Sequence, residues 1–279
     1  MSRYNKLYDD ISNKIIDKLK DGVLPWRKSW TSGVCRNLIT NNVYRGMNYL
    51  NLCFEDFPSP YYLTYLQCKD KGGSVLKGSK SRSIIYWKIT DIEEGDAIRK
   101  VPFLRLSNVF NLSQTTLYKE VGQEEIGAAA PSPTPQQIII NNMKNIPTIK
   151  NNFNRCYYNP VEDYISIPPI NDFDTQEEYY SSLFHELAHS TGHPTRLNRF
   201  IENHNTAEEE LVAELTASYL CAIAGISNTT LNNQVAYLDS WISTMEGDST
   251  FIVKASNQAK QASEYLLSYH NQAKQTVAV

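Results

Sequence analysis

A proline-alternating segment near the middle of the chain divides it into two parts. Residues 119–137 read KEVGQEEIGAAAPSPTPQQ, with three prolines in alternation with serine and threonine. Proline lacks a backbone N–H and its ring clashes inside a helix, so this composition is typical of an extended, semi-stiff linker. A length of 279 residues also fits two domains. We predict one domain over residues 1–122, a linker over 123–135 and a second domain over 136–279.

The two parts carry opposite charge. Residues 1–120 contain 19 Lys and Arg against 12 Asp and Glu, a balance of +7, and residues 121–279 contain 8 against 18, a balance of −10. This asymmetry indicates a polyanionic partner for the first part, the alternative being two domains that differ only in surface composition. The sequence has no apolar stretch of transmembrane length, and its five scattered cysteines favour reduced thiols over a disulfide scaffold. We expect a cytoplasmic protein without a membrane partner.

Periodicity predicts an α+β fold with two differently built domains. The first is expected to be a small basic α+β domain with helices at Tyr4–Lys20 and Asn48–Phe57, a hairpin within Val75–Trp87 and a strand at Val101–Leu112. The second is expected to be mainly helical with a small sheet that includes Tyr164–Ile167. A capping-box pattern at Thr175 predicts a helix to Gly192, and further helices are expected at Gln136–Met143, Ala207–Ala224, Val235–Met245 and Ile252–Lys274.

The sharpest chemical signal is the sequence HELAH at residues 185–189, inside the helix that begins after Thr175. Residues four apart lie on one helix face, so the imidazoles of His185 and His189 reach the same metal ion. Zn²⁺ suits two neutral imidazoles and a carboxylate, with a fourth position open to water. Glu186 is then placed as general base for that water. We predict one zinc ion, with Mn²⁺ or Co²⁺ as substitutes.

A zinc site of this kind needs a third protein ligand. Metzincins carry a histidine six residues after the second one, but Thr195 stands there, and His193 lies beyond the expected helix end. The better candidates are Glu210 and Glu214, which share one helix face. Their spacing from His189 resembles gluzincins, in which the first acid ligates zinc and the second hydrogen-bonds a ligand histidine. We predict that Glu210 is the third ligand and that Glu214 hydrogen-bonds one of the ligand histidines. The alternative is that these acids form the solvated face of an ordinary helix.

The first part also combines cations with aromatic residues, holding 16 of the 31 aromatics of the chain. Cations that follow a backbone and rings that stack on bases are what sequence-tolerant binding of single-stranded DNA requires. For each single aromatic, packing in the core is the alternative. The cations and rings form three clusters: Trp26, Arg27, Lys28 and Trp30; Tyr44, Arg45 and Tyr49; and Lys77, Lys80, Arg82, Tyr86 and Trp87. The candidate DNA-binding residues among them are Trp26, Arg27, Lys28, Trp30, Tyr44, Arg45, Lys77, Lys80 and Arg82.

Several of these segments resemble a known family. Those similar to the N-terminal domain of ArdC antirestriction proteins, which also begins some plasmid primases, are residues 25–30, 44–48, 77–80 and 108–114. Those similar to the zincin-like metallopeptidase domain of the same proteins are residues 157–160, 163–168, 184–193, 196–199 and 209–215. The basic turn departs from the Gly-Glu-Lys-Gly of the family, with Ser79 and Ser81 at its second and fourth places.

The resemblance implies an antirestriction protein of a plasmid or other mobile element, linked to conjugation. Its first domain is expected to bind single-stranded DNA and its second to be a zinc metallopeptidase, and the whole to protect incoming DNA from host restriction. A host restriction protein or another DNA-bound protein is the expected peptidase substrate, with the Tyr164–Ile167 strand offering its edge to an extended peptide. The alternative is a non-catalytic shield or decoy on single-stranded DNA, with a structural or latent metal site.

Overall fold

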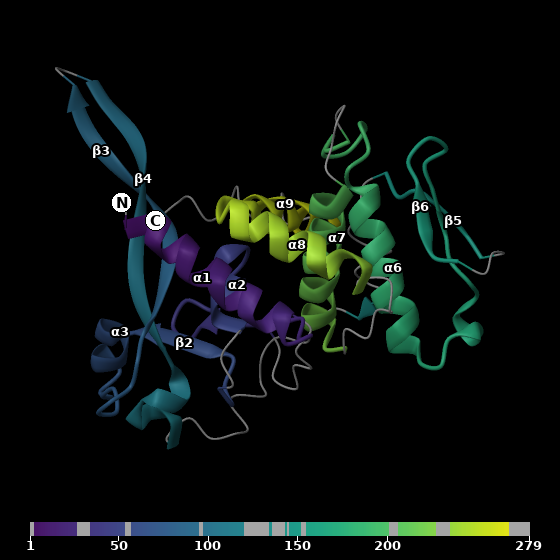
Figure 1. The fold of residues 1–279 in the computed structure, drawn as a ribbon. Helices are drawn as coiled ribbons and strands as arrows, with labels where there is room; N and C mark the ends of the chain where they lie inside the picture. The colour runs from purple at the N-terminus through teal and green to yellow at the C-terminus, as the bar shows by residue number, and fades with distance from the viewer. Residues whose placement is uncertain are drawn as a thin grey trace. The chain divides into compact units, whose positions relative to one another are not determined.

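The computed structural model describes residues 3–26, 34–53, 57–94, 97–119, 134–135, 143, 145–151, 155–200, 206–226 and 235–267. The chain forms two compact units (Figure 1). Cys35–Ala129 make one, called the inserted unit here, and Met1–Val34 together with Ala130–Val279 make the other, called the terminal unit. Among the described helices, none is long and apolar enough to cross a membrane.

The inserted unit is built on a four-stranded sheet with the order β1-β2-β4-β3. Its strands are β1 (Arg36–Asn37), β2 (Tyr61–Thr64), β3 (Arg82–Glu94) and β4 (Ala97–Asn111). β3 and β4 pair antiparallel along their whole length and form the long two-stranded ribbon in Figure 1. β2 is antiparallel to β4 and parallel to β1. The strand predicted at Val101–Leu112 is therefore the second part of β4.

The hairpin predicted within Val75–Trp87 is wrong. β3 pairs with β4, and Val75 forms an isolated bridge with Thr115. A turn does follow Val75, with Gly78 at φ 87°, and Gln114 Nε2 donates a hydrogen bond of 3.2 Å to the Lys80 carbonyl. Alternation of apolar residues predicts that a strand forms, but it does not identify the partner strand.

Two short helices complete the inserted unit. α2 (Met47–Cys53) covers the outer edge of β3, because the Asn48 side chain donates to the Ile85 carbonyl at 2.6 Å and accepts from the Ile85 N–H at 2.8 Å. Such contacts satisfy an edge that is otherwise open to pairing. α3 (Tyr65–Asp70) begins at a capping box between Thr64 and Gln67. Two 3₁₀ turns follow β4, and one core cluster of the unit contains Tyr61, Leu63, Cys68, Leu112 and Leu117.

The terminal unit is mainly helical, as predicted for the second domain. Its helices are α1 (Arg3–Lys20), α6 (Gln176–Ser190), α7 (Thr206–Ala224), α8 (Val235–Gly247) and α9 (Thr250–Leu266). Its small sheet has the order β5-β7-β6, from β5 (Thr148–Lys150), β6 (Tyr157–Asn159) and β7 (Tyr164–Ser166). The helix predicted at Gln136–Met143 lies outside the described residues, apart from Met143.

The position of β7 corrects one expectation from the sequence. β7 pairs with β5 on one side, parallel, and with β6 on the other, antiparallel. Because both of its edges are occupied, the Tyr164–Ile167 strand is not available to a peptide. The strand with an outer edge next to α6 is β6, which contacts that helix.

The first 34 residues belong to the terminal unit, which differs from the predicted domain boundary. The apolar side of α1 is buried, and α1 contacts α8 and α9; the buried residues include Ile11, Ile15, Ile16 and Leu19. The linker composition marks one of the two places where the chain passes between units, and the passage near residue 34 carries no such signal. Residues 35–119 still hold 12 Lys and Arg against 7 Asp and Glu, a balance of +5.

Candidate metal centre

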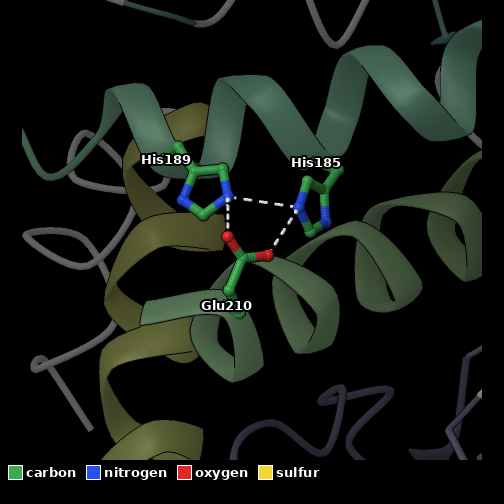
Figure 2. A group of neighbouring side chains, drawn as sticks. All are labelled: His185, His189 and Glu210. Atoms are coloured by element: carbon green, nitrogen blue, oxygen red, sulfur yellow. Dashed lines mark hydrogen bonds and ion pairs between the residues drawn. The ribbon is translucent and has the colours of Figure 1, made fainter. Parts of the chain in front are cut away.

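The two histidines of the HELAH sequence lie on one face of α6 (Figure 2). The N-cap of α6 is Thr175, whose hydroxyl accepts a hydrogen bond of 3.2 Å from the Glu178 N–H. Acidic residues in its first turn complement the helix dipole. From this start, His185 and His189 fall one turn apart, and Glu210 of α7 reaches them from the facing helix (Figure 2).

Three ligand atoms converge between α6 and α7. His185 Nε2 and His189 Nε2 are 3.1 Å apart, and the Glu210 carboxylate oxygens lie 3.4 Å from His185 Nε2 and 3.7 Å from His189 Nε2. Ligands at ~2.0–2.1 Å from a tetrahedral ion are about 3.3–3.4 Å from each other. The spacing and the donor types therefore fit one divalent ion, and the described residues hold this one group of three or more metal-binding side chains. The structure brings all three predicted ligands together.

Glu186 lies beside these ligands and is buried, with 7% of its surface exposed. Burial raises the pKa of its carboxyl, and the nearby His185 and His189 offset part of that rise. The nearby Tyr158 backbone N–H also offsets part of the rise in the pKa of this carboxyl. A carboxyl with a raised pKa is suited to accept a proton and return it near neutral pH.

Glu209 is a neighbour of the metal-binding group that sequence reasoning missed. Its Oε1 lies 3.2 Å from His189 Nδ1, and Arg199 holds its carboxylate with two bonds, Nη2 to Oε1 at 2.7 Å and Nε to Oε2 at 3.1 Å. A carboxylate on the second nitrogen of a ligand histidine fixes its tautomer and ring orientation. Helical spacing from Glu210 does not single out Glu209, because adjacent residues point in different directions. The sequence signal that could have pointed to Glu209 was the Arg196–Arg199 segment, which contains its partner Arg199.

Glu214 lies behind the other histidine. It is fully buried, and its Oε2 is 3.9 Å from His185 Nδ1. That nitrogen is buried and has no hydrogen-bond partner in the described part of the chain. The distance exceeds a hydrogen bond, so the predicted bond from His185 to Glu214 stays a prediction, with the two groups facing each other.

Tyr237 of α8 contacts the third ligand. The negative charge of Glu210 raises the pKa of Tyr237. The ring of Tyr237 stacks on Trp241, with centroids 6.2 Å apart. Each of the three ligands therefore has a neighbouring side chain that restricts its orientation or faces its remaining polar atom.

Comparison with known proteins places the chain in a family. The sequence-family model of zincin-like metallopeptidases matches residues 137–258. The family model of the N-terminal domain of anti-restriction factor ArdC matches residues 5–110. The metal-free crystal structure of antirestriction ArdC from plasmid R388 is 30% identical, with a TM-score of 0.75, over 95% of this chain and 98% of that one. The chain belongs to the ArdC antirestriction family. The two-domain α+β fold predicted from the sequence is thereby confirmed.

Two further relatives bear on the metal and on the wider family. The Mn(II)-bound structure of the same R388 ArdC is 31% identical, with a TM-score of 0.74, over 94% of this chain and 97% of that one. Together with the zincin-like domain, it indicates a divalent metal at the His185, His189 and Glu210 group. Two DNA primases TraC of Escherichia coli are 26% identical over 94% of this chain. The chain spans only 27% and 20% of their lengths.

The candidate DNA-binding residues divide by exposure. Lys77 and Lys80 are exposed, and Arg45 and Arg82 are partly exposed. Two others are corrected, because Trp26 and Tyr44 are buried, at 0% and 9% exposed, and offer no ring face to a base. Tyr44 packs against the ring of Tyr62, and Trp26 packs against Trp241. The remaining three, Arg27, Lys28 and Trp30, lie outside the described residues.

Metal affinity is expected to rise with pH because of His189. Burial opposes its charging, but hydrogen bonds to Glu209 and Glu210 prevail and raise its pKa from 6.5 to about 10 in the metal-free protein. A metal ion must displace that proton from Nε2, so the apparent affinity should increase about tenfold per pH unit across neutral pH. Competition with a chromophoric chelator at several pH values measures this slope, and a pH-independent affinity would contradict the assignment.

The same shift has a consequence for the stability of the metal-free protein. Since the folded-state pKa of His189 lies above its ordinary 6.5, its protonation stabilises the fold fully below about pH 6.5. That contribution is lost as the pH rises towards about 10. Thermal unfolding in the presence of chelator should show this decline, and metal should reduce it.

Proposed function

We propose that this protein is a mobile-element antirestriction factor that binds single-stranded DNA and hydrolyses peptide bonds with a zinc ion. The observation that carries the peptidase assignment is the convergence of His185, His189 and Glu210 next to the buried Glu186. Two imidazoles and one carboxylate leave a position for water, which is the ligand set of catalytic rather than closed structural zinc sites. The R388 ArdC bound Mn(II), so zinc is the part of this proposal that metal analysis must test.

His185, His189 and Glu210 would hold the zinc ion, which would polarise the scissile carbonyl as a Lewis acid and lower the pKa of a bound water. Glu186 accepts a proton from the attacking water at its carboxylate and later delivers it to the leaving amine. Its burial keeps bulk water from competing for that proton. Glu209 and Arg199 keep the His189 ring oriented through Nδ1.

The substrate peptide is proposed to lie along β6. β6 is an outer strand of its sheet and contacts α6, the helix that carries Glu186. A peptide that adds to the outer edge of β6 as a further strand gains backbone hydrogen bonds and passes beside the site. This edge takes the place of the Tyr164–Ile167 edge expected from the sequence.

The inserted unit offers a surface suited to single-stranded DNA on its long ribbon. Tyr86 of β3 and Phe103 of β4 are 44% and 40% exposed. Arg105 is exposed and pairs with Tyr86 across the strands, and Phe103 lies two residues along the same face. Exposed rings stack on bases and cations contact phosphates. Lys77 and Lys80 add exposed charge in the turn before β3.

Replacing the ribbon aromatics is expected to weaken single-strand binding. Tyr86→Ala and Phe103→Ala should each cost about 1–3 kcal/mol per lost base contact. Lys77→Ala with Lys80→Ala should instead reduce the slope of log affinity against log salt by about 0.7 per phosphate contact. Fluorescence anisotropy with a labelled oligonucleotide measures both.

The matched control is Tyr65→Ala. Tyr65 is 57% exposed in the same unit but lies on α3 rather than on the ribbon. An equal loss with Tyr65→Ala, or equal affinity of the native protein for duplex and single strands, would count against the ribbon as the binding surface.

The whole proposal is tested by transferring unmodified DNA into a restricting host in the presence of wild-type protein or Glu186→Gln. Loss of protection in the variant, with metal and DNA binding retained, supports hydrolysis as the antirestriction step. Full protection by the variant favours the alternative of a shield on single-stranded DNA. Absence of protection by the wild type would reject the antirestriction assignment itself.

A further inference from the structure

Trp26 lies deep in the terminal unit although it precedes the inserted unit in the chain. Its side chain is 0% exposed, and its ring packs edge-on against Trp241 with centroids 6.0 Å apart. The Ser218 hydroxyl of α7 donates a hydrogen bond to its backbone carbonyl. The residue is therefore fixed at both its backbone and its ring against helices that follow the inserted unit.

The indole of Trp26 is aimed at the carboxylate behind the metal site. Its Nε1–H donates to Glu214 Oε1 at 3.2 Å, between two buried side chains. The other oxygen of the same carboxylate, Oε2, faces His185 Nδ1 at 3.9 Å. That imidazole nitrogen is the buried polar atom that lacks a hydrogen-bond partner among the described residues.

This chain of contacts has a physical consequence for metal binding. A fully buried carboxylate is costly unless donors are held in place around it. When His185 binds a metal through Nε2, its proton is held on Nδ1, and an oriented carboxylate there makes the ring a better ligand. The Trp26 N–H restrains the Glu214 carboxylate at the oxygen that does not face His185.

We propose that Trp26 is a positioning residue of the metal site, acting through Glu214 on His185. The segment before the inserted unit is then an integral part of the metal centre, and metal binding is linked to the docking of that segment. The proposal rests on the metal site of the proposed function. It adds a residue outside the matched zincin-like region, residues 137–258.

The test is the zinc affinity of the full-length protein, measured by competition with a chromophoric chelator. Trp26→Phe keeps an aromatic ring and removes the donor, and we expect about a tenfold weaker affinity. Glu214→Gln should weaken it by a similar or larger factor. If Trp26 acts through Glu214, adding Trp26→Phe to Glu214→Gln causes little further loss. Additive losses would overturn the proposal, since they would mean that Trp26 acts independently of Glu214.

The control variant is Ile15→Val, which removes one buried methyl group from α1, leaves the segment docked and changes neither Trp26 nor Glu214. Its affinity should match the wild type, and a loss equal to that of Trp26→Phe would overturn the proposal. A wild type that binds no zinc would instead reject the metal site of the proposed function.

A measurement on the wild type covers the case in which Trp26→Phe does not fold. With nitrogen-15 in the indole rings, the Trp26 N–H resonance should shift when zinc replaces chelator. An unchanged Trp26 resonance on a zinc-loaded protein would also overturn the proposal.

Discussion

Glu186→Gln is expected to lower peptide hydrolysis by about 10²- to 10⁴-fold while leaving the metal bound. The amide keeps the size of the carboxylate, and its oxygen can still accept a hydrogen bond. It cannot accept a proton from water, which is the role proposed for Glu186. The metal ligands His185, His189 and Glu210 are unchanged in this variant.

The experiment measures cleavage of fluorescently labelled casein or a peptide library, with metal content measured on the same samples. Glu178→Gln is the matched control, because Glu178 lies in the first turn of the same helix, away from the ligands. Retained cleavage by Glu186→Gln would reject the general-base role. Loss of metal from this variant would mean that Glu186 supports the site itself.

The sequence predicted those residues of the metal centre whose relative positions follow from their spacing within a helix. His185, Glu186 and His189 lie on one helix with a readable start at Thr175. Glu210 was identified because its spacing from Glu214, on a second helix, and from His189 resembles the gluzincin arrangement. Periodicity within a helix fixes which side chains share a face, so such relations can be read before the fold is known.

The residues that sequence missed depend on distant segments. Glu209 acquires its role from Arg199, which reaches it after the chain has turned between α6 and α7. Trp26 meets Glu214 across 188 positions of sequence. The aromatic and basic cluster around Trp26 favoured a surface role, but Trp26 is buried because it packs on Trp241 of α8 and hydrogen-bonds Glu214 and Ser218 of α7. Tyr86 stands in a cluster read from the sequence, but its common face with Phe103 depends on the pairing of β3 with β4.

The same distinction explains the domain boundary. A proline-rich composition marks a linker because it acts on the local backbone. The crossing near residue 34 leaves no such mark, since α1 is a regular amphipathic helix whose apolar side fits either unit in principle. The family relation does not resolve it either, because the ArdC N-terminal model covers residues 5–110 as one block. The contacts of α1, including the ion pair between Lys20 and Glu246 of α8, assign this helix to the terminal unit.

Glu210→Ala is expected to lower metal affinity by more than about 100-fold, beyond the range for residues behind the ligands. Its two carboxylate oxygens, which would bind the metal, lie 3.4 Å from His185 Nε2 and 3.7 Å from His189 Nε2. Two imidazoles alone leave the ion with one protein ligand too few for a catalytic zinc site. Equilibrium dialysis against zinc, followed by metal analysis, measures the loss.

Two neighbouring acids on α7 provide the comparison for Glu210→Ala. Glu214→Ala removes a group that faces His185 Nδ1, so a loss of about 10- to 100-fold is expected. Glu208→Ala removes an acid that hydrogen-bonds Gln258 instead, and its affinity should stay at the wild-type value. The order of these three losses assigns the ligand: a larger loss with Glu214→Ala than with Glu210→Ala would show that the roles of the two glutamates are exchanged.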